Sequence, residues 1–123
     1  MLYEDLTEKI IGAAIEVHKE LGPGLLENVY SECLSYELNQ LDLKYNREIN
    51  LPVKYKTELL DCNYRIDFLI EDKVIVELKS VEKILKIHEA QILTYMKLSD
   101  KRIGLLINFN TDILKSGIKR FIL

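Results

Sequence analysis

Hydrophobic residues recur every three or four positions in three stretches of the chain, and this spacing predicts amphipathic helices. The stretches cover residues from about 5 to 21, 24 to 41 and 87 to 98. Asp5 and Glu8 resemble a capping box at the start of the first helix, and Gly22 and Pro23 predict its end. The sequence "LGPG" could also suggest a phosphate-binding loop, but a turn that stops one helix and starts the next is the simpler interpretation.

Shorter apolar runs in the rest of the chain predict strands. They are expected at residues 45–55, 59–70, 74–80 and 102–109, with an edge strand in the tail "GIKRFIL". Because helices both precede and follow the strands, we expect a layered α/β fold with a mixed central sheet flanked by helices. At 123 residues the chain is long enough for a real core, and we expect a single domain over residues 1–123.

The two predicted strands around "EDK" carry apolar residues that must share a face, because partners in an antiparallel pair point the same way. A three-residue turn over Glu71–Lys73 matches the two apolar sets, whereas a loop of two or four residues pairs them wrongly. This turn predicts three cross-strand pairs, which are Ile70 with Val74, Phe68 with Val76, and Ile66 with Leu78. These paired residues should then lie on one face of the hairpin, and Leu69 and Ile75 on the other face with the charged residues.

Charged residues stand inside the same two arms. The predicted register places Asp67 opposite Glu77, and Arg65 opposite Lys79. Facing carboxylates repel each other, so we expect positive charge between them. One interpretation is an exposed Glu77–Lys79 ion pair of little consequence. The other is a divalent-cation site, because Mg²⁺ takes one or two carboxylates and fills its other positions with water and substrate phosphate. Lys79 would point into that site, where it can stabilise developing charge or position a water.

Composition narrows the class of protein. Hydrophobic residues make up 48% and charged residues 30% of the chain, as in ordinary soluble globular domains. No apolar run is long enough to cross a bilayer, and the acidic N-terminus lacks the apolar core of a targeting signal. We therefore expect a cytoplasmic protein without a membrane partner. Cys33 and Cys62 form no CxxC pair, so free thiols are the expected state, and a disulfide is the alternative.

The net charge of −3 argues against a chain that binds nucleic acid through its overall charge. The two halves differ, however. Residues 1–61 hold 6 Lys and Arg against 12 Asp and Glu, whereas residues 62–123 hold 11 against 8. The first half therefore carries −6 and the second +3. A basic side on an acidic protein is one interpretation, and scattered surface lysines are the other.

Asp67, followed by Glu77-Leu78-Lys79 on the next predicted strand, resembles the D…ExK signature of the PD-(D/E)XK nuclease superfamily. Three quoted segments extend the likeness: "EVHKELGPGLLENVYSECLSYEL", "DFLIEDKVIVELKSV" and "HEAQILTYMKLSDKRIGLLINF". Together they resemble the small GxxExxxR family, a branch of that superfamily, over nearly the whole chain. The resemblance implies a restriction-endonuclease-like αβββαβ core, to which the predicted elements add one N-terminal helix.

The resemblance also implies roles for individual residues. Asp67 and Glu77 match the superfamily's metal ligands, and the Leu78 carbonyl matches its main-chain ligand. Lys79 matches the catalytic lysine. Glu27 matches the acidic residue that the preceding helix often directs towards the site. An ordinary first-turn glutamate, favoured by the helix dipole, is the alternative interpretation of Glu27.

Gln91 and Tyr95 match a QxxxY element on the helix that follows the site in RecB-like nucleases. His88 shares their helix face, and we interpret it as part of a polar helix surface rather than as a metal ligand. We interpret His18 as a partly buried structural residue. One departure from the family pattern is visible, because Ser31 stands where the GxxExxxR motif has its arginine.

The resemblance thus implies a Mg²⁺-dependent phosphodiesterase, with Mn²⁺ as a substitute ion. The expected protein is a small nuclease that acts on nucleic acid, with DNA favoured and RNA an open alternative. Because a small nuclease often needs a second subunit, a homodimer is one expected assembly. The alternative function is a non-catalytic module that binds nucleic acid or protein and keeps the nuclease fold.

Overall fold

The protein, in a computed structural model, is described over residues 2–123, apart from the side chains at positions 62 and 63. The expected free thiol of Cys62 therefore lies outside the described side chains, and Cys33 is a free cysteine. None of the helices in the described part of the chain is both long enough and apolar enough to cross a bilayer.

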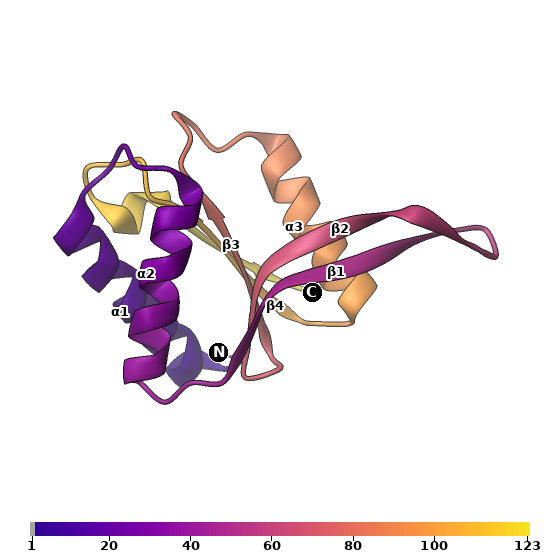
Figure 1. Ribbon diagram of the computed structural model, residues 1–123, viewed down its shortest axis with the longest axis horizontal. Helices are drawn as coiled ribbons and strands as arrows, with labels where there is room; N and C mark the ends of the chain where they lie inside the picture. Colours follow the sequence, from indigo (N-terminus) through magenta and orange to yellow (C-terminus); the bar gives the residue numbers. More distant parts are fainter. Residues whose placement is uncertain (1) are drawn as a thin grey trace.

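One mixed sheet lies between two helices on one face and a third helix on the other (Figure 1). Along the chain the elements are α1 (Glu4–Leu21), α2 (Glu27–Gln40), β1 (Tyr45–Tyr55), β2 (Glu58–Ile70), β3 (Val74–Lys79), α3 (Lys86–Ser99), β4 (Ile103–Asn108), the 3₁₀ helix η1 (Leu114–Gly117) and β5 (Ile118–Ile122). The strands are ordered β1-β2-β3-β4-β5. β3 and β4 run parallel and are joined through α3, and the other neighbours are antiparallel. The predicted α/β fold with a mixed, helix-flanked sheet is confirmed.

The helix starts differ from the prediction. The predicted capping box is wrong, because Glu4 and Asp5 already lie inside α1 and Tyr3 takes the capping position without a side-chain hydrogen bond. The Tyr3 carbonyl instead accepts the Thr7 N–H at 2.9 Å. The second helix begins at Glu27 rather than near residue 24, because Gly24 has a φ of 94° that no right-handed helix allows. The glycine and proline turn is therefore longer than predicted.

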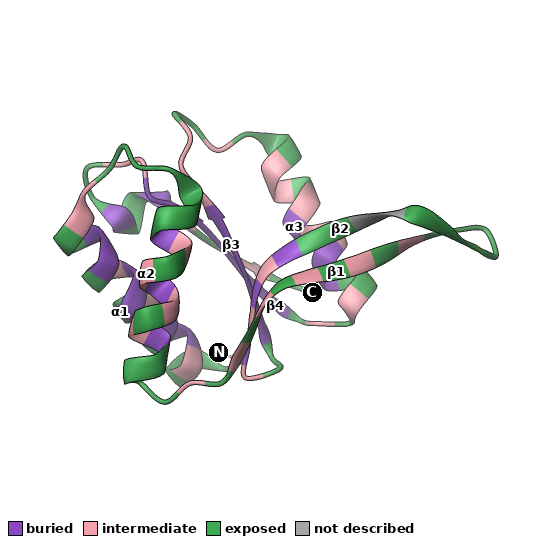
Figure 2. Cartoon of the chain, in the orientation of Figure 1, coloured by how far each residue is buried: buried purple, intermediate pink, exposed green. Residues whose placement is uncertain are grey.

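The core has two layers, and Figure 2 shows its buried residues on the inner faces of the helices and along the central strands. In the layer between the sheet and the helices α1 and α2, Tyr30 stacks on Phe109 with ring centroids 4.4 Å apart. His18 packs near the same ring, and its Nε2 lies 2.8 Å from the Thr111 carbonyl oxygen, which confirms the structural interpretation of this histidine. Burying each large apolar side chain contributes about 1.5–3 kcal/mol.

The second layer lies between the sheet and α3, and it shows where the hairpin prediction fails. Phe68 packs in the layer beneath α1 and α2, whereas Ile66, two residues earlier on the same strand, packs with α3. Residues two apart on a regular strand share a face, so β2 must turn over between them. The prediction that Ile66 and Phe68 face the same way is therefore wrong.

The turn-over in β2 coincides with an irregularity in β1. Arg47 pairs with Phe68 and Ile49 with Ile66, which leaves Glu48 facing Asp67 without a ladder pair. Glu48 has a φ of 53°, in the left-handed region. Such a conformation costs a non-glycine residue about 1 kcal/mol or more, and strained positions of this kind gather at functional sites. The hairpin thus bends away from the sheet at the level of Asp67, and its tip projects from the body (Figure 1).

We expect Gly117→Ala to destabilise the protein by about 1–3 kcal/mol, as overpacking of a filled site does. A Cβ at this position would lie 2.3 Å from the backbone oxygen of Asn108 and 3.2 Å from the Thr111 Cγ2 atom. The backbone oxygen cannot move without disturbing the end of β4. Urea unfolding measures the effect, with Gly12→Ala in α1 as the matched control. No atom lies within 4 Å of that Cβ, so the control should stabilise the helix by about 0.5–1 kcal/mol. Equal stability of both variants would contradict this prediction.

Candidate functional site

The candidate site lies where β2 separates from β3. The pairs Ile70–Val74 and Phe68–Val76, joined by the three-residue turn, are confirmed. The described ladder ends at Phe68. The expected pair of Ile66 with Leu78 is wrong, because these residues pack in opposite layers of the core. Among the described residues, the expected ladder pair of Arg65 with Lys79 does not form either. Strand separation leaves backbone N–H groups that need other acceptors, because an unpaired buried N–H is costly.

Two carboxylates provide those acceptors. The Asp67 N–H donates to the Oε1 atom of Glu77 at 2.9 Å, and the Leu78 N–H donates to the Oδ2 atom of Asp67 at 2.8 Å. Each carboxylate thus reaches across to the backbone of the other strand. Glu77 is only 5% exposed, and Asp67 is partly buried. The two acidic side chains therefore lie together at the strand junction, as the register predicted.

This arrangement makes it hard for both carboxyl groups to ionise. Burial, and after it the neighbouring charge of Asp67, raises the pKa of Glu77 to about 8. Burial also raises the pKa of Asp67. The backbone hydrogen bonds and the Lys79 ammonium group act in the opposite direction on both carboxyl groups, but they do not compensate for the loss of water. The positive charge near the two carboxyl groups is therefore too small to keep both of them ionised.

The carboxylates fit a divalent cation that needs few protein ligands. Oδ1 of Asp67 and Oε2 of Glu77 make no hydrogen bond to any described residue, so each side chain keeps an oxygen that a cation can use. In the described part of the chain, no three His, Cys, Asp or Glu side chains are grouped to hold a metal ion. A closed protein cage is thus absent there, and two carboxylates match the needs of Mg²⁺, which keeps water and substrate oxygens as its other ligands.

Glu27 faces this junction from the first turn of α2. Its Oε2 atom accepts the Ser80 N–H at 3.4 Å, next to the end of β3. Its charge raises the pKa values of both Asp67 and Glu77, although less than burial does. Glu27, Asp67 and Leu78 line one cavity of about 250 Å³. The structure thus brings Glu27, an exposed residue, to the side of the predicted carboxylates, and its role there stays a prediction.

The α3 helix contributes Tyr95 to the other side of the junction. Tyr95 is 6% exposed, and its ring lies 5.5 Å from that of Tyr64. Burial raises the pKa of Tyr95 to about 12, and the negative charges of Glu77 and Asp67 act in the same direction. The Tyr95 hydroxyl therefore lies close enough to the carboxylate pair for the charges of Glu77 and Asp67 to affect its pKa. Gln91 is partly buried on the same helix and makes no hydrogen bond to the pair.

His88 has a local role at the start of α3. Its Nδ1 atom accepts the Leu85 N–H at 3.0 Å, which satisfies one of the free N–H groups at the helix end. This contact supports the interpretation of His88 as part of a polar helix surface rather than a metal ligand, which stays a prediction.

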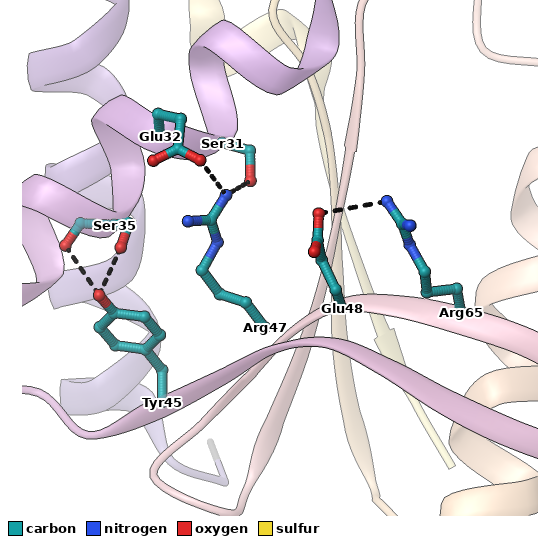
Figure 3. A network of polar contacts seen from close by, with 7 residues as sticks. All are labelled: Ser31, Glu32, Ser35, Tyr45, Arg47, Glu48 and Arg65. Carbon is teal, nitrogen blue, oxygen red and sulfur yellow. Dashed lines mark hydrogen bonds and ion pairs between the residues drawn. The ribbon is translucent and has the colours of Figure 1, made fainter.

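Two arginines near the carboxylates were not predicted as site residues. Arg47 and Arg65 line the same cavity as Asp67. Figure 3 shows the network that ties β1 to α2, in which Tyr45 contacts Ser35 and Arg47 contacts Ser31. The sequence signal for Arg47 was its place at an inward position of β1, where an apolar residue is usual.

Comparison with known proteins bears on this arrangement. The family model described as the PD-(D/E)XK nuclease superfamily matches residues 4–121. The solved structure named "Crystal structure of SSO0001" has a similar fold, with a TM-score of 0.60 at 16% sequence identity. The match covers 98% of this chain but 59% of the other, so this chain spans little more than half of that protein's length. No curated protein matches the chain. Since the family model covers nearly all of the sequence that forms the sheet, the helices and the carboxylate junction, the chain belongs to the PD-(D/E)XK nuclease superfamily.

Proposed function

We propose that the protein is a divalent-metal-dependent phosphodiesterase that cuts DNA in the cytoplasm. The observation that carries this proposal is the pair of carboxylates at the β2–β3 junction, each bound to the backbone of the opposite strand. Glu77 is buried and Asp67 partly buried, neighbouring positive charge does not offset the loss of water, and Asp67 lines a cavity of about 250 Å³. A divalent cation would supply the positive charge that the carboxylates lack. Water and the oxygens of a phosphodiester would then complete the coordination of that cation.

Asp67 and Glu77 would hold Mg²⁺, or Mn²⁺ as a substitute, with the Leu78 carbonyl as a third ligand. The bound ion would supply Lewis-acid stabilisation to the phosphate. Backbone hydrogen bonds fix both carboxylates in place before any ion arrives, so little ordering remains to be done on binding. This fixed geometry supports a metal site better than an exposed ion pair, whose side chains would be free to move.

Lys79 would act on the reacting groups from the end of β3. Its positive charge reaches both carboxylates, since it lowers the pKa values of Asp67 and Glu77. In the proposed reaction the ammonium group stabilises negative charge on the phosphate and orients the attacking water. Glu27, which faces the pair from α2, would bind a water on the cavity side. Tyr95, and with it Gln91, would shape the site from α3.

We also propose that the chain belongs to the GxxExxxR branch of the superfamily. Gly24 and Glu27 occupy the first two motif positions, and Ser31 replaces the arginine. The Oγ atom of Ser31 accepts a hydrogen bond from the Arg47 guanidinium group at 2.7 Å, so a guanidinium group still lies beside this turn of α2. That contact supports the assignment despite the substitution.

We expect Mg²⁺ and Mn²⁺ to raise the unfolding midpoint of the purified protein, because an ion bound only by the native state stabilises it by about 2.7 kcal/mol at a hundredfold excess over its Kd. Thermal unfolding in increasing MgCl₂ or MnCl₂ measures this, with KCl at equal ionic strength as the control. The same samples are incubated with duplex DNA, single-stranded DNA and RNA, and cleavage of DNA is expected. A midpoint that ignores both ions, together with no cleavage of any substrate, would support the non-catalytic module instead.

A further inference from the structure

Two arginine side chains stand at the wall of the cavity that Asp67 lines, and neither is part of the D…ExK signature. Arg47 comes from β1 and Arg65 from β2, and Glu48 stands between them (Figure 3). Cationic side chains beside a carboxylate pair could simply neutralise it. Arg65 does so in part, because its charge lowers the pKa of Asp67. Each arginine, however, is held by its own acidic partner rather than by the pair.

Arg47 is held rigidly from three sides. Its Nη2 atom donates to the Ser31 Oγ atom at 2.7 Å and to the Glu32 Oε1 atom at 3.2 Å. Its guanidinium group lies 5.3 Å from the centre of the Phe68 ring, in a cation–π arrangement. The Nη1 atom makes no hydrogen bond to any described residue, and the buried Nε–H also lacks an acceptor. The side chain is thus positioned with its Nη1 donors to spare, whereas its Nε–H is buried away from any incoming ligand.

Arg65 is held loosely and is open to solvent. Its Nη2 atom lies 3.3 Å from the Glu48 Oε1 atom, and 60% of its side chain is exposed. Glu48 adopts the left-handed conformation that interrupts the β1–β2 ladder opposite Asp67. The strained residue therefore lies between the two arginines and beside the carboxylate junction. An exposed ion pair of this kind contributes little to stability and can be exchanged for another anion.

We propose that Arg47 and Arg65 form a subsite for the phosphates that flank the scissile one in a nucleic acid. Glu32 and Glu48 hold the two guanidinium groups in the free protein and give way to phosphate oxygens when the substrate binds. Planar guanidinium groups bind phosphate with paired, charge-assisted hydrogen bonds, which are stronger than single contacts with exposed carboxylates such as those of Glu32 and Glu48. The inference rests on the proposed function, since it takes the carboxylate pair as the cutting site.

The subsite also explains how a chain with a net charge of −3 could bind a nucleic acid, which is strongly negative. Affinity for nucleic acid depends on the number of phosphates neutralised at the contact rather than on total charge. Two arginines beside the junction would place that local charge next to the reacting phosphate. The paired glutamates keep the arginines neutralised until a stronger anion displaces them.

Salt-dependent DNA binding tests the subsite. Binding of a labelled duplex oligonucleotide is measured by fluorescence anisotropy in EDTA, so that no cleavage occurs, at several KCl concentrations. Arg47→Gln and Arg65→Gln should each weaken binding about tenfold, and each should reduce the slope of log K against log salt by about 0.9. Arg102→Gln is the matched control, because that exposed arginine bonds the Leu123 carbonyl at the chain end, and it should change neither quantity.

The acidic partners give a second, independent readout. Glu48→Gln releases Arg65 and removes a negative charge from the cavity wall, so binding should become tighter by several-fold. Glu16→Gln, an exposed change on α1, should leave binding as it is. Because Arg47 packs on Phe68, its variant is first checked for a native unfolding midpoint. Arg65 is largely exposed, so its variant keeps the test decisive even if Arg47→Gln fails to fold.

The outcomes separate the subsite from the proposed function. A protein that cuts DNA, but whose two arginine variants bind with an unchanged salt slope, would overturn the subsite and leave the nuclease intact. A protein that cuts nothing, yet loses slope in both variants and not in Arg102→Gln, would keep the subsite and reject catalysis. Equal losses in all three variants would mean non-specific charge and overturn the subsite. Stabilisation of the parent by inorganic phosphate, without oligonucleotide binding, would overturn the assignment to nucleic acid.

Discussion

Replacing Glu77 by Gln should abolish phosphodiester cleavage while the protein stays folded. The glutamine keeps an oxygen that can accept the Asp67 N–H, so the strand junction should survive. What the variant loses is the negative charge that would hold the metal ion. If that ion supplies about 4 kcal/mol of transition-state stabilisation, the rate falls by about a thousandfold. Cleavage assays in Mg²⁺ and in Mn²⁺ measure the loss, and thermal unfolding tests the fold.

Two further variants make this expectation specific. Asp67→Asn can still accept the Leu78 N–H and should also lose cleavage and the metal-induced rise in midpoint. Lys79→Ala should differ, because the metal-free protein becomes less stable when the cation near both carboxylates is gone, while the rise in midpoint with metal persists. Glu16→Gln on α1 is the control and should match the parent. Full cleavage by Glu77→Gln would remove this residue from the proposed mechanism.

The local part of the site could be predicted from sequence. A three-residue turn and matched apolar pairs are short-range features, so Ile70–Val74 and Phe68–Val76 followed from the pleat alone. The register set by these two pairs also predicted that Asp67 and Glu77 lie opposite each other at the strand junction. The pattern could not show that β2 turns over between Ile66 and Phe68. Ile66 is apolar and alternates correctly with its neighbours, and nothing in its identity tells which helix covers it.

Arg47 and Arg65 were not predicted as site residues for a related reason. Arg47 stands at an inward position of β1, where its charge is unusual, but only the tertiary contacts with Ser31 and Phe68 show that this charge is used. The left-handed φ of Glu48 had no sequence signal either, because glycine and asparagine are the usual residues in that conformation. Asp67 and Glu77 were thus found through their spacing and the other motif residues through the family resemblance, whereas residues placed by the bend of the hairpin required the structure.

In the absence of metal, the free energy of unfolding should fall as the pH rises from about 5 to about 8. Burial raises the pKa of Glu77 from 4.5 to about 8 in the folded protein. In this range the folded state therefore keeps a proton that the unfolded state has released. Stability decreases with pH wherever the folded state binds more protons, by about 1.4 kcal/mol per pH unit for one group. Asp67, whose pKa is also raised, acts in the same direction.

Urea unfolding in EDTA at several pH values measures this slope in the parent and in Glu77→Gln. The variant has no proton to release at position 77, so its slope should be smaller, and its stability should exceed that of the parent most clearly near pH 8. Saturating Mg²⁺ should flatten the slope of the parent, because an ion that binds the ionised carboxylates stabilises the folded state most at the pH where the proton is lost. The same ion should leave the slope of Glu77→Gln unchanged. Equal slopes for parent and variant in EDTA would mean that Glu77 is ionised in the folded protein, and the junction would then have no unmet demand for a cation.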